Sequence, residues 1–544
     1  MRILMALTAF GALLSPAQAA EVGRVDEIVV QDTEETRAMQ ERRESTTAKT
    51  IVTRREMAEL GGQTAADVLR RLPRLFFSGP PSINKDIRMN GLDKEFQNVL
   101  INGSRPPGGG EKREFSLDRI PVEQIERMEV FKNPNASHDA DAVAGFVNIV
   151  LKRPPPKRTI SVSGQGSVND RADRLGDKFT ATVGDQFGPV GAQVGGTRSD
   201  EFRGKDKAVS DTAKNERESE SELKRFLTVS GLLNLEWRIG ESDRVSLRPL
   251  ISNQDESTDK DRLVKNLATG ANKSRNRESE VKEASLQSYG ADWEHKFSGG
   301  AILKLEGSWA MNEENKEKKT AQFTGAALAF SKNVFEDERK QDKERVAAAE
   351  FKLPWTGPRQ NENLLSTGLK WRDKDRRVTK TNWEVNPAGV RADKTVPDDS
   401  YRVDETINAA FVMNEASLTD KLVLTPGVRV EFTDGGYQSG GGRSATGRFV
   451  DWNPSAHALY RIRDGLQARA SVARTISRPS FRDKVPTRSV KPDKVEEGNP
   501  DLGAARSINA EAGLEKYFGK TGFLGAGGFY KRIVTTQVLR GSCA

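Results

Sequence analysis

A long series of segments in which polar and apolar residues alternate constrains the fold of this chain more than any other feature. In segment 227–239, LTVSGLLNLEWRI, Leu227, Val229, Leu235 and Trp237 occupy every second position on one face, together with other apolar or small residues. A period of two places such residues on one face of an extended strand. The pattern recurs in 301–310, 347–355 and 421–432, and about sixteen such segments follow Thr159.

Two architectures fit this pattern: a transmembrane β-barrel, and a soluble secreted β-sandwich or propeller. The segments run to about 10 to 13 residues, longer than the ~5–6 of common soluble strands, and Trp237, Trp309 and Tyr460 lie at strand ends. No repeat of fixed period indicates a propeller. The pattern favours an up-and-down outer-membrane barrel with tight turns on one rim. Its long loops are expected in the charged stretches 199–222, 253–283 and 373–400.

The first residues indicate export. MRILMALTAFGALLSPAQAA combines the basic Arg2, an apolar run from Ile3 to Leu14 and the small-residue exit Ala17-Gln18-Ala19. This is typical of a signal peptide, predicted over residues 1–19. The alternative is a buried helix or an anchor, but the apolar run is short for ~30 Å of hydrocarbon. Cys543 is the only cysteine, so the sequence offers no internal disulfide framework.

Composition is compatible with a barrel and gives no sign of an enzyme. The chain is 30% charged, but a barrel needs apolar residues on only one face of each strand. A net charge of +8 from 86 basic and 78 acidic residues does not argue for nucleic acid. His138, His295 and His457 lack metal-ligand spacing, and no nucleophile elbow or HExxH occurs. We expect no catalytic residue, metal or cofactor; His138 beside Asp139 and Asp141 is better explained as a polar turn.

A region of about 100 residues before the strands has a mixed α and β pattern. Ala65, Val68, Leu69 and Leu72 share one helical face, and Thr64 is placed to cap that helix. Strands are predicted over 98–103, 124–132 and 145–153, and KRPPPKR, 152–158, is a stiff linker.

The polar N-terminal tail contains an isolated strand-like run, EIVV, at Glu27 to Val30. Three β-branched residues favour an extended chain, but the twenty residues after them are strongly polar and offer no hairpin partner. The run is therefore predicted to pair outside its own domain, the alternative being the first strand of the mixed region.

Together these features resemble TonB-dependent outer-membrane receptors. EIVV is similar to the family's TonB box. TAADVLRRLP (64–73), NVLINGSRP (98–106), RIPVEQIERMEVFKNPNAS (119–137) and DAVAGFVNIVLKRP (141–154) resemble its plug, and LTPGVRVEF (424–432), ARTISRPSF (473–481) and GNPDL (498–502) resemble its late barrel. The resemblance implies a mixed fold, an N-terminal α+β plug domain inside an antiparallel transmembrane β-barrel. The expected regions are the signal peptide 1–19, a periplasmic tail with the TonB box 20–49, the plug 50–153 and the barrel 159–544.

The resemblance also implies the function and partners. Asp26, Glu27, Ile28, Val29 and Val30 are expected to bind the TonB energy-transducing complex by strand addition in the periplasm of a Gram-negative bacterium. The protein would lie among outer-membrane lipid and import a scarce, bulky small-molecule ligand, by default a ferric siderophore. Haem, cobalamin or an oligosaccharide are alternative ligands. A passive porin or a surface-binding barrel is the rival function.

Two sets of site residues are expected. Arg105, Lys112 and Arg113 lie in the glycine-rich turn 104–113 and are candidate ligand contacts at the plug apex, unless the turn is simply solvated. By resemblance, Arg127 of the plug would pair with Glu415 or Glu431 of the barrel, the alternative being an ordinary polar lumen face.

The family has 22 strands and a terminal aromatic residue, whereas this chain has about sixteen predicted strands and ends at Ala544. The resemblance therefore predicts a truncated or frameshifted form, whose barrel is incomplete at its C-terminal end and lacks at least about four strands. An open edge exposes unpaired backbone to lipid, which would oppose assembly.

Overall fold

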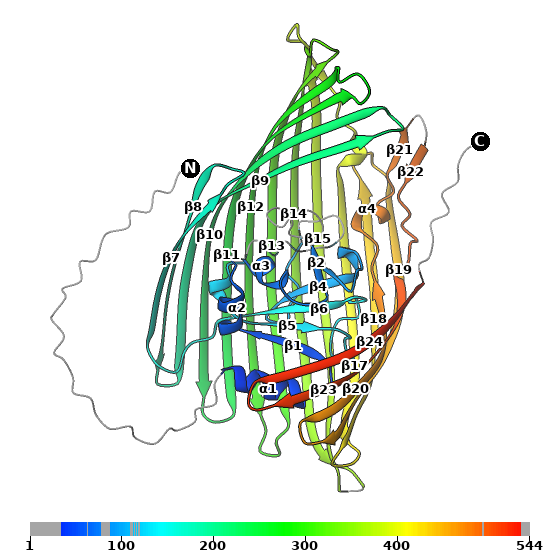
Figure 1. Ribbon diagram of the computed structural model, residues 1–544. Helices are drawn as coiled ribbons and strands as arrows, with labels where there is room; N and C mark the ends of the chain where they lie inside the picture. Colours follow the sequence, from blue (N-terminus) through cyan, green and yellow to red (C-terminus); the bar gives the residue numbers. More distant parts are fainter. Residues whose placement is uncertain are drawn as a thin grey trace, which may run out of the picture.

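The computed structural model describes residues 34–534, apart from 63, 78–86, 109–112, 114, 116, 118–119, 359 and 492–493. It has two parts, a small α+β domain and a large curved antiparallel sheet that surrounds it (Figure 1). We call them the plug and the barrel sheet. The segment with EIVV lies outside the described residues.

The plug is built on a four-stranded sheet in the order β1-β5-β6-β4, in which β4 and β6 are parallel and the other pairs antiparallel. The predicted strands are present with slightly different ends. The elements are α1 (Glu34–Glu44), β1 (Lys49–Thr53), α2 (Arg54–Leu60), α3 (Ala65–Leu69), β2 (Leu75–Phe77), β3 (Ile87–Met89), η1 (Lys94–Phe96), β4 (Gln97–Ile101), η3 (Val122–Gln124), β5 (Ile125–Phe131) and β6 (Gly145–Leu151).

Local sequence explains where the short plug helices begin. Thr53 caps α2: its hydroxyl accepts from the Glu56 amide, and its own amide donates to the Glu56 carboxylate at 2.8 Å. Thr64 begins α3 as predicted, and its amide donates to Asp67. Such reciprocal bonds satisfy amides that a helix start leaves unpaired. Helix α1 was not predicted, and it has no buried residue.

The barrel sheet contains sixteen strands, as the alternation predicts, and β7 and β24 end its strand order. Within the described residues, each of these two strands pairs with one neighbour only. The strands are β7 (Thr159–Asn169), β8 (Arg174–Phe187), β9 (Val190–Asp211), β10 (Glu216–Ile239), β11 (Asp243–Asn266), β12 (Asn272–Lys296), β13 (Ile302–Thr324), β14 (Ala329–Thr356), β15 (Glu362–Val385), β16 (Arg391–Asp393), β17 (Tyr401–Ser417), β18 (Leu422–Ser439), β19 (Ser444–Arg463), β20 (Leu466–Ser477), β23 (Ala505–Phe518) and β24 (Gly522–Val534).

The alternation separates two environments. Along β10, Phe226, Leu232 and Asn234 are buried toward the plug, whereas Val229 and Trp237 are about half exposed on the outer face. No helix in the described part of the chain is both long and apolar enough to cross a membrane.

The expected loop positions need correction. Most of the charged stretches predicted as loops continue the strands, which reach 28 residues in β14. Cross-strand ion pairs such as Lys205 with Glu220 and Lys260 with Glu222 link neighbouring strands there. These stretches were predicted as loops because they are rich in charged residues. Backbone hydrogen bonds and opposite charges on adjacent strands nevertheless stabilise a sheet that faces water on both sides.

Candidate functional site: the ion-paired contact between plug and barrel sheet

The loop between β5 and β6 carries two plug carboxylates into a set of barrel cations. Asp139 lies 2.9 Å from Lys370 Nζ on β15, 2.9 Å from Arg429 Nη2 on β18 and 3.4 Å from Arg372 Nη1 on β15. Burial alone would raise the pKa of Asp139, but Lys370, Arg429 and Arg372 outweigh it and hold the pKa below its ordinary value. The carboxylate therefore stays charged and ties the plug to two strands.

Asp141 is the second plug anchor. Its Oδ2 lies 2.6 Å from Arg105 Nη1 of the plug and 3.2 Å from Arg478 Nη1 just after β20. Burial raises the pKa of Asp141, and Arg105 and Arg478 reverse this effect and hold it well below its ordinary value. Arg105 thus orients a carboxylate that a barrel cation also contacts.

Two barrel carboxylates complete the contact. Glu431 on β18 lies 2.6 Å from both Arg429 Nε and Arg478 Nη2, and it accepts a hydrogen bond from the Ala140 amide at 3.2 Å. Glu405 on β17 binds plug Arg113 through both terminal nitrogens, at 2.7 and 2.8 Å. A bidentate pair of this kind fixes direction as well as distance.

The segment after β20 folds inward and covers Arg113. Arg113 Nε donates to the Pro479 carbonyl at 2.8 Å, and its guanidinium lies 4.0 Å from the centre of the Phe481 ring. Phe481 begins the short helix α4 (Phe481–Lys484) and is fully buried. The segment after β20 therefore holds the Arg113 side chain in addition to Glu405 of β17.

These contacts form one network with an excess of positive charge. It contains six basic side chains and four carboxylates, namely Arg105, Arg113, Lys370, Arg372, Arg429 and Arg478 with Asp139, Asp141, Glu405 and Glu431. Removing one partner of a buried pair leaves the other uncompensated, at a cost of about 3–5 kcal/mol. The network therefore specifies how the plug sits while contributing less net stability than its pair count suggests.

The plug meets the two sides of the barrel sheet through different proportions of apolar and charged contact. On one side, Leu232 of β10, Leu250 of β11 and Leu286 of β12 join the hydrophobic core of the plug, and an ion pair at 2.7 Å links Lys178 of β8 to Glu123 of the plug. On the other side, strands β15, β17 and β18 and the residue after β20 contact it through the ion network. When an ion-paired contact opens, water can take over its hydrogen bonds, whereas opening an apolar contact exposes apolar surface to water. The ion-paired side is therefore the one suited to reversible opening.

The predicted site residues reach different places. Arg105 and Arg113 lie in this network rather than free at the apex, so their expected ligand contact requires these pairs to open. Lys112 and residues 26–30 lie outside the described residues. Glu431 contacts the plug through the Ala140 amide, but its ion pairs are with Arg429 and Arg478 and not with the expected Arg127.

The expected partners of Arg127 need correction. Arg127 lies 2.7 Å from Glu129 and 3.4 Å from Glu41, both on the plug side of the chain, whereas Glu415 accepts from the Thr46 hydroxyl at 3.0 Å. Arg127 is on β5, which pairs with β1, so Glu129 and Glu41 lie close enough to form ion pairs with its guanidinium.

Sequence reasoning missed Asp139, Asp141, Glu405 and the barrel cations as members of the site. One signal was present: Lys370, Arg372, Lys374 and Arg376 alternate along β15 and therefore share the inner face. Asp139 and Asp141 meet these cations instead of a metal. Among the residues that the structure describes, no group of three or more His, Cys, Asp or Glu side chains is arranged to hold a metal ion.

Comparison with protein-family models gives two matches that follow the two parts of the structure. Residues 41–146 match the TonB-dependent receptor plug domain, and residues 233–542 match the TonB-dependent receptor-like β-barrel. The second match alone covers more than half of the chain.

Solved structures share the fold at low sequence identity. The unliganded ferric citrate transporter FecA is 15% identical with a TM-score of 0.63, over 88% of this chain and 68% of that one. The ferric enterobactin receptor PfeA of Pseudomonas aeruginosa is 16% identical with a TM-score of 0.62, over 91% and 72%. The ferric-catecholate import receptor Fiu of E. coli K12 is 14% identical with a TM-score of 0.64, over 90% and 74%.

Proposed function

The chain belongs to the TonB-dependent receptor family, and from this premise we propose that it imports a scarce, bulky ligand across the outer membrane with energy from the TonB complex. The outer membrane holds no ATP, so the energy must arrive through a partner that spans the periplasm. The proposed chemistry is binding and release, with no bond of the ligand broken.

The observation that carries this proposal is the unequal attachment of the plug. Leu232, Leu250 and Leu286 hold one side mainly by apolar contact, with an ion pair between Lys178 and Glu123 beside them. On the other side, Asp139 and Asp141 hold the plug by several ion pairs. A pull on the plug would separate the ion-paired side first, because water and released side chains can satisfy the charges there. This would open a path beside β15 to β20 without expelling the whole domain.

Residues Asp26 to Val30 are the proposed handle for that pull. They precede α1, which contacts the barrel sheet through Arg43 and Asp464 at 2.7 Å. An extended segment with β-branched residues suits strand addition to an edge strand of TonB, where main-chain hydrogen bonds supply the affinity.

The proposed ligand is a ferric siderophore. The three structural neighbours named above handle ferric citrate, ferric enterobactin or ferric catecholates by their names, and six basic groups against four carboxylates suit an anionic complex. Arg105, Lys112 and Arg113 are the proposed plug contacts. Haem, cobalamin and an oligosaccharide are the ligand classes that the test must separate.

The test is a deletion of Glu27 to Val30 in a strain whose own copy of the gene is removed. We expect uptake of the labelled ligand to be lost while surface binding persists, and replacement of residues 31–33 by Gly and Ser to leave both unchanged. The ligand panel contains ferric siderophores, haem, cobalamin and oligosaccharides. Unimpaired uptake after the deletion would refute energy coupling through this segment. If only haem, cobalamin or an oligosaccharide were taken up, the ferric siderophore would be the wrong ligand class.

A further inference from the structure

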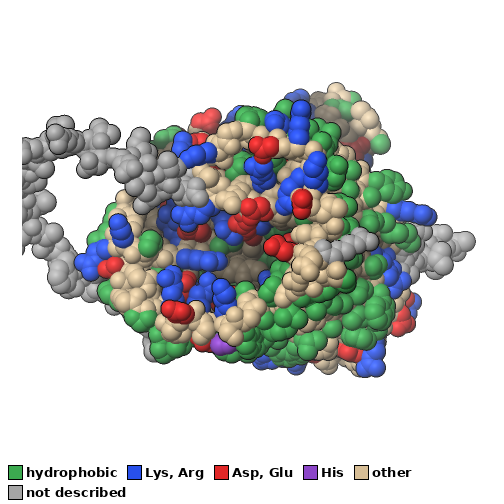
Figure 2. All heavy atoms as spheres, turned by 90° about the horizontal axis from the view of Figure 1, so that it is seen from below, with side chains coloured by type: hydrophobic (Ala, Val, Ile, Leu, Met, Phe, Trp, Pro, Cys, Tyr) green, Lys and Arg blue, Asp and Glu red, His purple; other side chains and the backbone are tan. Residues whose placement is uncertain are grey.

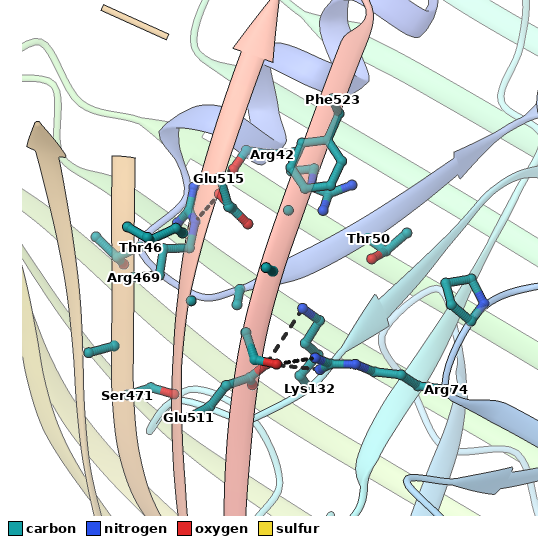
Figure 3. A pocket seen from close by; sticks show the side chains of 18 residues that line it. Arg42, Thr46, Thr50, Arg74, Lys132, Arg469, Ser471, Glu511, Glu515 and Phe523 are labelled. Atoms are coloured by element: carbon teal, nitrogen blue, oxygen red, sulfur yellow. Dashed lines mark hydrogen bonds and ion pairs between the residues drawn. The ribbon is translucent and has the colours of Figure 1, made fainter. Parts of the chain in front are cut away.

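A cavity of about 350 Å³ lies between the plug and the last strands of the barrel sheet, β20, β23 and β24 (Figure 3). Arg42 of α1, Arg74 and Lys132 enter it from the plug side, and Arg469 of β20 enters it from the barrel sheet. Seen from the end that carries α1, Lys and Arg side chains gather around the opening of the barrel sheet (Figure 2). The cavity belongs to neither the apex nor the ion network described above.

The charges around this cavity do not balance. Glu511 on β23 lies 3.2 Å from Arg74 Nη1 and 3.5 Å from Lys132 Nζ, and Glu515 lies 2.8 Å from Arg469 Nε. Four cations therefore face two carboxylates. Arg469 is buried, whereas Arg74 and Lys132 are partly exposed, so water screens the excess of two positive charges only in part and an anion would offset it.

The guanidinium of Arg469 does not use all of its N–H groups in hydrogen bonds to the described residues. Its Nη2 donates to the Arg42 carbonyl at 2.7 Å and to the Arg43 carbonyl at 3.1 Å. Its Nη1 has no hydrogen-bond partner among the residues that the structure describes, and the residue is only 6% exposed. A guanidinium carries five N–H donors, so Arg469, which lines the cavity, has an N–H group left for an acceptor that a small shift of the side chain would bring into reach.

The walls leave room for such an acceptor, because the strands here present small residues, namely Ala470, Ser471, Gly513, Gly525, Ala526 and Gly527. Phe523 closes one end beneath Arg42, whose guanidinium lies 3.5 Å from the ring centre. Burial lowers the pKa of Arg42 and of Lys132, and the nearby carboxylates do not fully offset this effect. Both side chains would gain from another negative charge.

We propose that this cavity binds a small dianion through carboxylate or phosphate oxygens, with Arg42, Lys132 and Arg469 as its donors. Charge-assisted hydrogen bonds to a guanidinium are about twice as strong as neutral ones, and two cations in excess match two negative charges. Because Arg42 lies in α1, shortly after residues 26–30, an anion bound here would also contact the segment that leads to the proposed TonB contact. Binding itself does not depend on transport.

The test is isothermal titration calorimetry of the purified full chain in detergent, at low ionic strength, with inorganic phosphate and with succinate. We expect saturable binding of one anion per chain, weakened at least about tenfold by Arg469→Gln and by Lys132→Gln. Arg448→Gln is the matched control, because Arg448 is exposed on the outer face of β19, does not line the cavity, and pairs with the exposed Asp434. It should bind like the parent chain.

Lys132→Gln keeps the experiment decisive if Arg469→Gln perturbs α1, since Lys132 makes no contact with that helix's carbonyls. No saturable heat up to about 10 mM of either anion, or equal affinities for all three variants, would overturn the proposal. So would a signal that appears only with vesicles containing phosphatidylglycerol, because the occupant would then be a lipid headgroup. None of these results bears on uptake, so the transport proposal stands or falls separately.

Discussion

Arg113 of the plug and Glu405 of the barrel sheet form a bidentate ion pair with nitrogen–oxygen distances of 2.7 and 2.8 Å, and both side chains are almost completely buried. The two residues are 292 positions apart in the chain. Their pairing decides how the apex of the plug is oriented, since the backbone of Pro479 and the ring of Phe481 hold the same guanidinium.

Breaking this pair from one side should cost more than removing both charges. Arg113→Met leaves Glu405 buried without its main partner, so we expect the plug to lose about 3–5 kcal/mol of unfolding free energy, and Glu405→Met to do the same. The double variant should recover much of that loss, because no unpaired charge remains. Urea titration followed by limited proteolysis of the plug measures all three, and strictly additive losses would contradict the pairing.

Acid should weaken the plug in two separable stages. Burial, and then the neighbouring His457, lower the pKa of His138 to about 3, from an ordinary value of about 6.5. His138 must stay neutral when folded but is free to protonate when unfolded, so stability falls as pH drops from about 6.5 toward 3. Asp139 and Asp141 have depressed pKa values, so their contribution is complete above about pH 4 and is lost only below it.

Two substitutions separate these stages. His138 packs against the stacked rings of Phe131 and Phe146, with ring centres 5.0 and 4.8 Å away, so His138→Phe keeps an aromatic ring there and should flatten the loss between pH 6.5 and 4. Asp139→Asn should lower stability at neutral pH and change the acid dependence only below about pH 4. Urea midpoints measured across this range would contradict the assignment if His138→Phe kept the slope of the parent chain.

The glycine of the GNPDL motif should tolerate no side chain. A Cβ on Gly498 would overlap the carbonyl oxygen of Val485, next to α4, whereas a Cβ on Gly503 meets nothing within 4 Å. Gly498→Ala should therefore displace the segment that covers Arg113, at a cost of about 1–3 kcal/mol. Gly503→Ala is the control, and equal protease sensitivity of the two variants in residues 478–504 would show that the contact is not limiting.

A charged substitution on the outer face of the strands should destabilise the protein only where that face contacts lipid. Leu233 points outward at the middle of the apolar stretch 227–239 of β10, and Ser221 points outward in the charged half of the same strand, beyond Arg225. Leu233→Arg should cost about 2–4 kcal/mol of folding free energy in a bilayer, and Ser221→Arg about 0–1. Folding into lipid vesicles followed by gel-shift assay compares them. Equal yields of folded protein would contradict a membrane belt at Leu233.

The sequence by itself determined the elements and their environments. The period of two along 227–239 predicted a strand with one apolar face, and Thr64 before Ala65 predicted the start of α3. Both are local properties, because alternation and capping depend on residues a few positions apart. The same local reading placed charged stretches such as 253–283 in loops, since a strand with water on both faces has no apolar signature.

Only the tertiary structure decided which charges meet. Lys370 and Arg372 looked like any polar inner face until the fold brought Asp139 to them across more than 200 positions of chain. Arg127 of the plug was predicted to pair with Glu415 or Glu431 of the barrel sheet, but its guanidinium lies beside Glu129 and Glu41 instead. An ion pair depends on distance in space, and a spacing along the chain does not encode that distance when hundreds of residues intervene.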